Sequence, residues 1–556
     1  MSSPDPVAKL IALFYGSQPL TESPLTGTAT MGLYDPMRFV LRLRPDLHAQ
    51  LNVLPAGIYQ RSAITDAQVA AFATLLHETV HWWQHIGTNF GLLTSLKYPA
   101  QAHMLHVNLR ELLAAGIRVK PLVEYAFTKP DLPAELLEHL NRALNYWFDL
   151  ETAGALTDEP KRTPALTSNT NPFFLSTGHC FHMWWSAVIQ TLAATFDPAF
   201  RFLPNVTRWS EPFKKLSIRQ EEGFFEGSKI RIPPLGTQAI YEGQARLCQL
   251  QYLHHATSRS LADYAAEGML DGVYGEAFAL FLQVLREAQP VSATDPLVGL
   301  FLLICDIALN PTDGFPFDIT HHESFVITND PGLRFLLLCQ YLMLRAPELK
   351  RSIVRYDKAE YVHVSGYLAG LIACHSPYES STRVNEWMDK EASLQQLLTE
   401  EAACDYQLGN LPIRLLFSKY LRFQQDKLAN PHFFCWPGMY LVERPGQEVS
   451  LPEVKSLFSR HQAFFSDDEH GDVHPLRMPG VPEQQLTATR DEFYAWNCTY
   501  DLVRQWVVAS GPFTFEYGWL SHRHTPEAMA AWATDLFHQA FGVVPQDFTP
   551  VTPAGS

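Results

Sequence analysis

Two histidines and a glutamate stand close together in the stretch LLHETVHWWQHIG, residues 75–87. His77 and His81 are four residues apart, so on a helix they share one face, with Cβ atoms about 5–6 Å apart. That separation lets both imidazoles bind one zinc ion through bonds of about 2.0–2.1 Å. Glu78 would lie beside them, where it can take a proton from a water that the metal activates. The pattern His-Glu-x-x-His therefore predicts a zinc site with its own general base.

His85 continues this helical face but is expected to lie outside the metal site. It follows His77 by eight residues, or about 12 Å along a straight helix, which two zinc bonds of about 2 Å cannot span. The longer motif with a third histidine also fails, because Gln84 and Gly87 occupy the positions that require glycine and histidine. This excludes the metzincin class of peptidases. We interpret His85 as a structural residue first, and otherwise as one that supports a metal ligand or lines the cleft.

The residues around the motif, TLLHETVHWW at 74–83, resemble the longer signature of zincin metallopeptidases. In that signature uncharged residues flank the motif and a hydrophobic residue closes it. The tail HWWQHIGTNFG also resembles a pattern seen in bacterial zincin-like proteins. The resemblance covers one helix, and it implies a zincin-like core, a Zn²⁺ cofactor and peptidase activity. The alternative is a buried helix whose histidines have ordinary polar partners beside two tryptophans.

A catalytic zinc ion usually has three protein ligands and one open position, so one ligand is missing from this helix. In gluzincins the third ligand is a glutamate on a second helix, and Glu242 is the first candidate for that position. Gly243 and Ala245 beside it are small, which would allow this helix to approach the histidine helix closely. The string Glu-Gly-x-Ala also resembles the third-ligand segment of aminopeptidase-like gluzincins. Its separation of more than 150 residues from the first motif requires an insertion between the two helices.

Other residues compete for the remaining roles in such a site. Glu401, with Asp405 four residues later, resembles the Glu-x-x-x-Asp segment of membrane-associated zincins and is the alternative third ligand. Glu276 is a weaker candidate, for which we expect a structural role. Tyr241 and Tyr274 can each donate a hydrogen bond to the oxyanion of a tetrahedral intermediate, and the sequence does not distinguish them.

The elements that must position these residues are mainly helices. Thr65 and Gln68 form a capping-box pattern that predicts a helix over residues 66–86, and a second helix over about 238–256 carries Glu242. A further helix is expected after Ser260. Strand-forming pieces within residues 31–64, at 38–43 and 57–61, predict a small sheet. The expected fold is mainly α, of the α+β type, with a zincin-like catalytic core, a small N-terminal sheet and large helical additions.

The chain length suggests several modules. We expect a catalytic region over residues 1–290, a helical region over 291–465, and a linker followed by a C-terminal helical region over 466–556. Within these regions, the polar segments 153–175 and 466–485 are predicted to be loops or linkers. One interlocked helical body is the alternative.

Composition limits the class of partner and the cellular compartment. The net charge is −16 and the chain has no long basic run, which argues against nucleic acid as the main partner. Eight cysteines without a Cys-x-x-Cys pair indicate a reducing compartment. The longest apolar run meets Asp306 before the roughly 20 residues that a membrane span needs. With no basic leader at the N-terminus, these features predict a cytoplasmic location without a membrane span.

Together the motifs predict a zinc-dependent metallopeptidase of gluzincin type. His77, His81 and Glu242 would hold the metal, Glu78 would be the general base, and a protein or peptide would be the substrate. We expect the helical region to form a wall of the cleft or to dock a protein partner. Two alternatives remain: a helical interaction or scaffold protein with a vestigial or structural zincin site, and a zinc hydrolase of a non-peptide amide.

Overall fold

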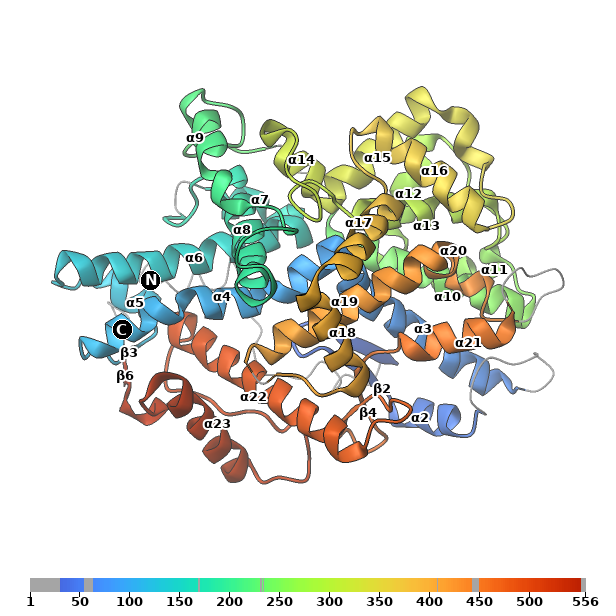
Figure 1. Cartoon of the computed structure of the whole chain (residues 1–556). Helices are drawn as coiled ribbons and strands as arrows, with labels where there is room; N and C mark the ends of the chain where they lie inside the picture. Colours follow the sequence, from blue (N-terminus) through green and yellow to red (C-terminus); the bar gives the residue numbers. More distant parts are fainter. Residues whose placement is uncertain are drawn as a thin grey trace, which may run out of the picture.

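The structure, a computed structural model, describes residues 31–54, 64–168, 171–230, 233, 235–407, 409–442 and 450–551. Helices make up 66% of it and strands 4%. Figure 1 shows α3 and α10 within the helical body, with α4 and α6 extending to one side and α12, α13, α15 and α16 at the upper right. The predicted class, mainly helical with a small N-terminal sheet, is therefore confirmed.

The helices follow one another through most of the chain. In the first half they are α2 (Pro45–Asn52), α3 (Asp66–Gly87), α4 (Asn89–Ala114), α5 (Leu122–Phe127), α6 (Ala134–Asp158), α7 (Thr163–Leu166), α8 (Thr177–Phe196), α9 (Ser210–Ile218), α10 (Thr237–Thr257), α11 (Leu261–Ala266) and α12 (Val273–Leu285). In the second half they are α13 (Pro296–Leu309), α14 (Phe325–Asn329), α15 (Pro331–Arg345), α16 (Lys358–Leu371), α17 (Pro377–Lys390), α18 (Ala392–Ala403), α19 (Leu411–Ala429), α20 (Pro431–Cys435), α21 (Leu451–Arg460), α22 (Glu483–Val508) and α23 (Pro526–Phe541).

The histidine helix α3 begins and ends where the sequence predicts. The Thr65 hydroxyl accepts a hydrogen bond from the Gln68 backbone N–H, and the Gln68 side chain accepts one from the Thr65 backbone N–H, so the capping box is present. The helix ends at Gly87, where an added Cβ would lie 2.4 Å from the Phe423 ring of α19. Glycine at this position therefore lets α19 pack against the end of α3.

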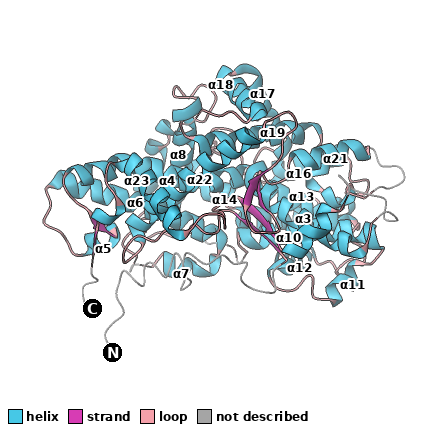
Figure 2. Cartoon of the chain, turned by 90° about the horizontal axis from the view of Figure 1, so that it is seen from below, coloured by secondary structure: helices cyan, strands magenta, loops and turns pink. Residues whose placement is uncertain are grey.

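A four-stranded sheet lies beside α3, between helices on either side (Figure 2). Its strands are β1 (Gly32–Asp35), β2 (Val40–Leu43), β4 (Phe465–Asp467) and β5 (Val473–Pro475), in the order β1-β2-β4-β5. β1 pairs with β2 and β4 with β5 in antiparallel fashion, whereas β2 and β4 are parallel. The strands β3 (Val119–Lys120) and β6 (Thr549–Pro550) form a separate parallel pair. β1 is thus the edge strand that packs against α3.

Three predicted segments differ from the structure. Residues 153–158, expected in a loop, are the last turns of α6. Residues 466–475, expected in a linker, include β5 and complete the sheet, because buried Phe465 and Val473 pack in the core. The single helix expected after Ser260 is two helices, α11 and α12, separated by glycines with positive φ at 268 and 272. The strand expected at 57–61 lies outside the described residues.

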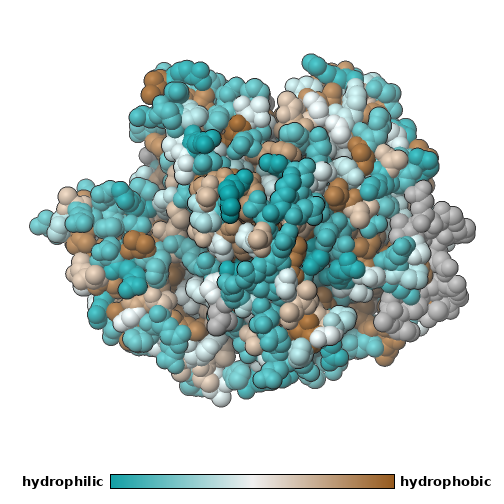
Figure 3. Space-filling model, viewed as in Figure 1, coloured by the Kyte–Doolittle hydropathy of each residue, from teal (hydrophilic) through white to brown (hydrophobic). Residues whose placement is uncertain are grey.

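Two buried clusters hold the helices together. The larger contains residues from all three predicted regions, among them Leu76, Phe301 and Phe493. The smaller joins α4, α5 and α6 to α22 and α23 through side chains such as Trp147 and Trp506. On the face seen in Figure 3, hydrophobic side chains are scattered among hydrophilic ones. Among the described helices, none combines the length and the apolar character needed to cross a bilayer.

Candidate metal centre

Three side-chain atoms from two helices converge at one point. His77 Nε2 and His81 Nε2, both on α3, lie 3.1 Å apart. Glu242 Oε2, on α10, lies 3.3 Å from His77 Nε2 and 3.4 Å from His81 Nε2. The structure therefore brings together the three residues that the sequence predicts as metal ligands.

The spacing of these three atoms fits a zinc ion. Four ligands at bonds of about 2.0–2.1 Å in a tetrahedron lie about 3.3–3.4 Å from one another. The observed separations, 3.1–3.4 Å, agree with these edges. Two imidazoles and one carboxylate are also one of the ligand sets found in catalytic zinc sites. Such sites leave the fourth position for water or substrate. The donor set and its spacing thus both suit zinc.

Gln84 orients the imidazole of His81. The Nδ1 atom of His81 lies 2.8 Å from Gln84 Oε1, which can only accept, so Nδ1 carries a proton and Nε2 is the ring nitrogen that faces the site. The Gln84 amide in turn donates to the backbone oxygen of Tyr241 and to Gln244 Oε1, both at 2.9 Å. One side chain of α3 therefore fixes a ligand and ties α3 to the helix that carries Glu242.

Replacing Gln84 with methionine should lower zinc affinity about 10- to 100-fold, as expected for loss of a hydrogen bond to a ligand imidazole. The shape of the side chain is nearly kept, so helicity should not change. Competition with a coloured zinc chelator measures the affinity. Gln84→Glu keeps the acceptor for His81 and should bind zinc more tightly than Gln84→Met. Equal affinity in all three proteins would show that this bond does not orient the ligand.

Glu78 lies next to the converging atoms and is 5% exposed. Burial raises the pKa of its carboxyl to about 7, although the Tyr34 backbone N–H donates a hydrogen bond to it and opposes this shift. β1 supplies that N–H, and it approaches so closely that a Cβ on Gly32 would lie 2.9 Å from Glu78 Oε1. Glycine at position 32 therefore lets the edge strand reach the glutamate.

The two histidines differ in their electrostatic surroundings. Burial lowers the pKa of His77 to about 4, although its hydrogen bond with Glu242 opposes the shift. Burial of His81 also acts to lower its pKa. The hydrogen bond and the charge of Glu242 outweigh this effect, so the net result is a pKa raised to about 9. Glu242 itself is held well below its usual pKa by the two imidazoles, against the opposing effect of burial. The Glu242 carboxylate is thus ionised at neutral pH.

A cavity of about 590 Å³ opens onto these residues. β1, α3, α4, α6, α10 and α12 line it, with His85 on the same face as His77 and His81. Both oxyanion candidates lie on its wall. The Tyr274 ring is 6.0 Å from that of His77 and 4.1 Å from the Arg246 guanidinium, whereas Tyr241 contacts His85. The structure places His85 in the cleft lining, one of the alternatives to the structural role that the sequence favours.

The competing acids lie in other surroundings. Glu401 forms ion pairs with Lys419 at 2.8 Å and with Arg422 at 3.3 Å. Glu276 is exposed on α12. The expectation that Gly243 faces the histidine helix is wrong, because an added Cβ would meet Ala277 of α12 and Phe301 of α13 at 3.4 Å. The small residue therefore allows α10 to pack against α12 and α13 instead.

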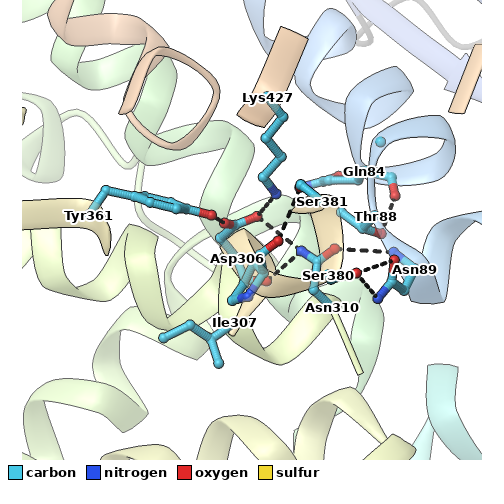
Figure 4. A network of polar contacts seen from close by, with 12 residues as sticks. Gln84, Thr88, Asn89, Asp306, Ile307, Asn310, Tyr361, Ser380, Ser381 and Lys427 are labelled. Atoms are coloured by element: carbon cyan, nitrogen blue, oxygen red, sulfur yellow. Dashed lines mark hydrogen bonds and ion pairs between the residues drawn. The ribbon is translucent and has the colours of Figure 1, made fainter. Parts of the chain in front are cut away.

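A buried polar network holds the C-terminal end of α3 (Figure 4). Asp306 of α13 pairs with Lys427 of α19 at 2.6 Å and accepts hydrogen bonds from Tyr361 and Asn310. Asn310 accepts a hydrogen bond from the backbone N–H of Asn89, the first residue of α4. Gln424 of α19 donates to the Gly87 backbone oxygen. These bonds join the α3–α4 junction to α13 and α19.

We expect Lys427→Met to lower the free energy of unfolding by about 3–5 kcal/mol, since it leaves the Asp306 carboxylate buried without its cation. Urea unfolding followed by circular dichroism measures the change. The matched control is Lys215→Met, which removes an ion pair with Glu211 between two side chains that are each 67% exposed. The free energy of unfolding of that variant should equal that of the wild type. Equal stability of the two variants would contradict a structural role for the buried pair.

A second group of potential ligands lies in the β4–β5 turn. Asp468, Asp472 and His474 bring their ligand atoms within 4.8 Å of one another. However, Asp468 already bonds to His474 and to two backbone N–H groups, and Asp472 to Arg523 and Ser521. These bonds explain the cluster without a metal.

The sequence did not point to Gln84 or to the backbone of Tyr34 as supports of the site. Gln84 occurs in the tail of the motif, but its partners on α10 lie 157 and 160 residues further along the chain. The Tyr34 N–H contact depends on the position of β1 against α3, for which the sequence has no local signal.

Comparison with protein-family models, with curated proteins and with solved structures finds no match for this chain.

Proposed function

We propose that this chain is a zinc-dependent metallopeptidase of gluzincin type. The convergence of His77 Nε2, His81 Nε2 and Glu242 Oε2 within 3.1–3.4 Å supports the proposal most directly. The buried Glu78 beside them and the cavity of about 590 Å³ support a site that performs chemistry rather than one that only stabilises the fold.

The side chains divide the work of peptide hydrolysis. His77, His81 and Glu242 would hold a zinc ion, and this ion would supply the Lewis acidity that polarises a substrate carbonyl and acidifies water. Glu78 takes the proton of the attacking water and then passes it to the leaving amine. A carboxyl with a pKa of about 7 suits both transfers, because it can hold or release a proton near neutral pH.

A peptide is favoured over another amide by the position of β1. This strand lies at the edge of the sheet in the described part of the chain, and its residues Gly32, Leu33 and Tyr34 line the cavity. An extended peptide can add to such an edge through main-chain hydrogen bonds. A small non-peptide amide would leave most of this cavity unfilled.

The proposal predicts about one zinc ion per chain, bound by the three protein ligands of a catalytic site. Elemental analysis of protein that has never met a chelator should find this content, and the double variant His77→Ala/His81→Ala should lose it with little change in helicity. Zinc-loaded wild type should also cleave peptides in an unbiased library, with the double variant as control. A protein that neither holds zinc nor regains it would contradict the proposal.

We further propose a cytoplasmic location. All eight cysteines are free thiols, and seven of them are buried. This usage is typical of proteins in reducing compartments.

A further inference from the structure

Tyr34, His85 and Tyr241 form a group on the cavity wall next to the metal ligands. His85 lies four residues beyond His81, or about 6 Å along the axis of α3. Its ring centroid is 5.2 Å from that of Tyr34 and 5.2 Å from that of Tyr241. Three separate elements, β1, α3 and α10, therefore bring these polar aromatic side chains together.

Three polar atoms of this group have no hydrogen-bond partner among the described residues. Tyr34 Oη, His85 Nδ1 and Tyr241 Oη are buried, and none has a hydrogen-bond partner among the described residues. Tyr34 and His85 are only 5% and 6% exposed. Buried polar groups in folded proteins are nearly always hydrogen-bonded, because an unpaired one is costly. Three such atoms together on the wall of one cavity indicate a position at which a ligand completes the bonds.

Other cavity-wall residues differ in this respect. The Tyr98 hydroxyl donates to the Tyr500 backbone oxygen at 2.9 Å. Glu151 pairs with Lys97 and accepts a hydrogen bond from Gln101. Polar atoms without a partner are thus not a general property of the wall, although His77 Nδ1, beside the candidate metal site, also has none among the described residues.

The chemistry of the group defines what it can bind. Each tyrosine hydroxyl can donate and accept, and a neutral imidazole offers one donor and one acceptor. The group carries no formal charge of its own, so a charged side chain would lose its water there without gaining a counter-charge. A carboxamide offers two N–H donors and an oxygen with two lone pairs, which matches three partners at once.

We infer that Tyr34, His85 and Tyr241 form a subsite for the carboxamide side chain of asparagine or glutamine, beside the scissile bond. This inference rests on the proposed peptidase function and names its substrate class. The adjacent turn of α3 holds His81, so a side chain in the subsite belongs to a residue that flanks the bond at the metal. The proposed selectivity comes from polar atoms that an apolar side chain would leave unpaired.

Two matched pairs of zinc-binding hydroxamates test the subsite without requiring turnover. In each pair, one compound carries an asparagine side chain and the other carries a leucine side chain of similar shape. The two pairs differ in the side of the zinc-binding group on which this side chain lies. In one pair the asparagine compound should bind zinc-loaded wild type at least about 10-fold more tightly, measured by titration calorimetry. In Tyr34→Phe/Tyr241→Phe, which loses only two oxygen atoms, this ratio should fall to one or below.

Tyr98→Phe is the matched control, because its hydroxyl already has a partner, and it should keep the wild-type ratio. If the double variant fails to fold, the two single variants should each lose part of the ratio. Equal affinities in both wild-type pairs, or a ratio that survives in the double variant, would overturn the subsite. Peptide cleavage without preference for asparagine or glutamine would overturn the subsite and leave the peptidase function standing. Selective hydroxamate binding without any peptide cleavage would support the subsite and contradict the peptidase function.

Discussion

Glu78→Gln is expected to keep zinc and lose turnover, by about 10²–10⁴-fold, the contribution typical of a general base. The amide has nearly the same shape as the carboxyl and can still accept the hydrogen bond from the Tyr34 backbone N–H. It cannot take a proton from water. The loss should therefore appear in kcat, with the zinc content of the wild type retained in elemental analysis.

Glu78→Asp is the matched variant for this measurement, because it keeps the base but withdraws it by one methylene. Its activity should fall between those of the wild type and Glu78→Gln. Equal turnover of all three proteins on a peptide that the wild type cleaves would exclude Glu78 as the base. Loss of zinc in Glu78→Gln would instead indicate that this residue supports the metal site.

The parts of the site that could be predicted are those with a local physical signal. The capping box of Thr65 and Gln68 fixes the start of α3 within a few residues, and helix periodicity then places His77 and His81 on one face. Both signals lie within one helix, so they do not depend on the rest of the fold. The structure has this helix and this face as predicted.

The structure corrects one reason for predicting Glu242 as the third metal ligand. The prediction used the small residue Gly243 as a sign of close approach to α3, but Gly243 faces α12 and α13. The approach of α10 to α3 is instead supported by the bonds from Gln84 to the Tyr241 backbone oxygen and to Gln244. The glycine in α10 thus correctly indicated close packing against another helix. The sequence alone could not identify which helix Gly243 faces.

The pairing of β2 with β4 could not be predicted from the sequence. It joins Val40 to Phe465 and Leu41 to Ser466, over a separation of more than 400 residues. β4 has only three residues, too few for an alternating pattern to stand out, and it follows directly on a helical region. The segment therefore looks like a polar linker, although it completes the sheet whose edge strand contacts Glu78.

Glu242→Ala is expected to weaken zinc binding by more than the roughly 10- to 100-fold that follows loss of an outer hydrogen-bonding partner. In the proposed site the carboxylate, whose oxygen lies 3.3 and 3.4 Å from the two imidazole nitrogens, would contribute both a ligand atom and the negative charge that offsets the dication. Competition with a zinc chelator gives the affinity.

The matched control is Glu401→Ala, which removes a buried glutamate with two cationic partners from a different helix. Glu401 is 7% exposed and pairs with Lys419 and Arg422, so its loss should lower stability and leave zinc affinity unchanged. Glu242→His separates the two contributions of Glu242, because an imidazole can supply a ligand atom without the charge, as in sites with three histidines. Its affinity should lie between those of Glu242→Ala and the wild type. Wild-type zinc affinity in Glu242→Ala would exclude this carboxylate as the third ligand, and loss of zinc in Glu401→Ala alone would transfer that role to Glu401.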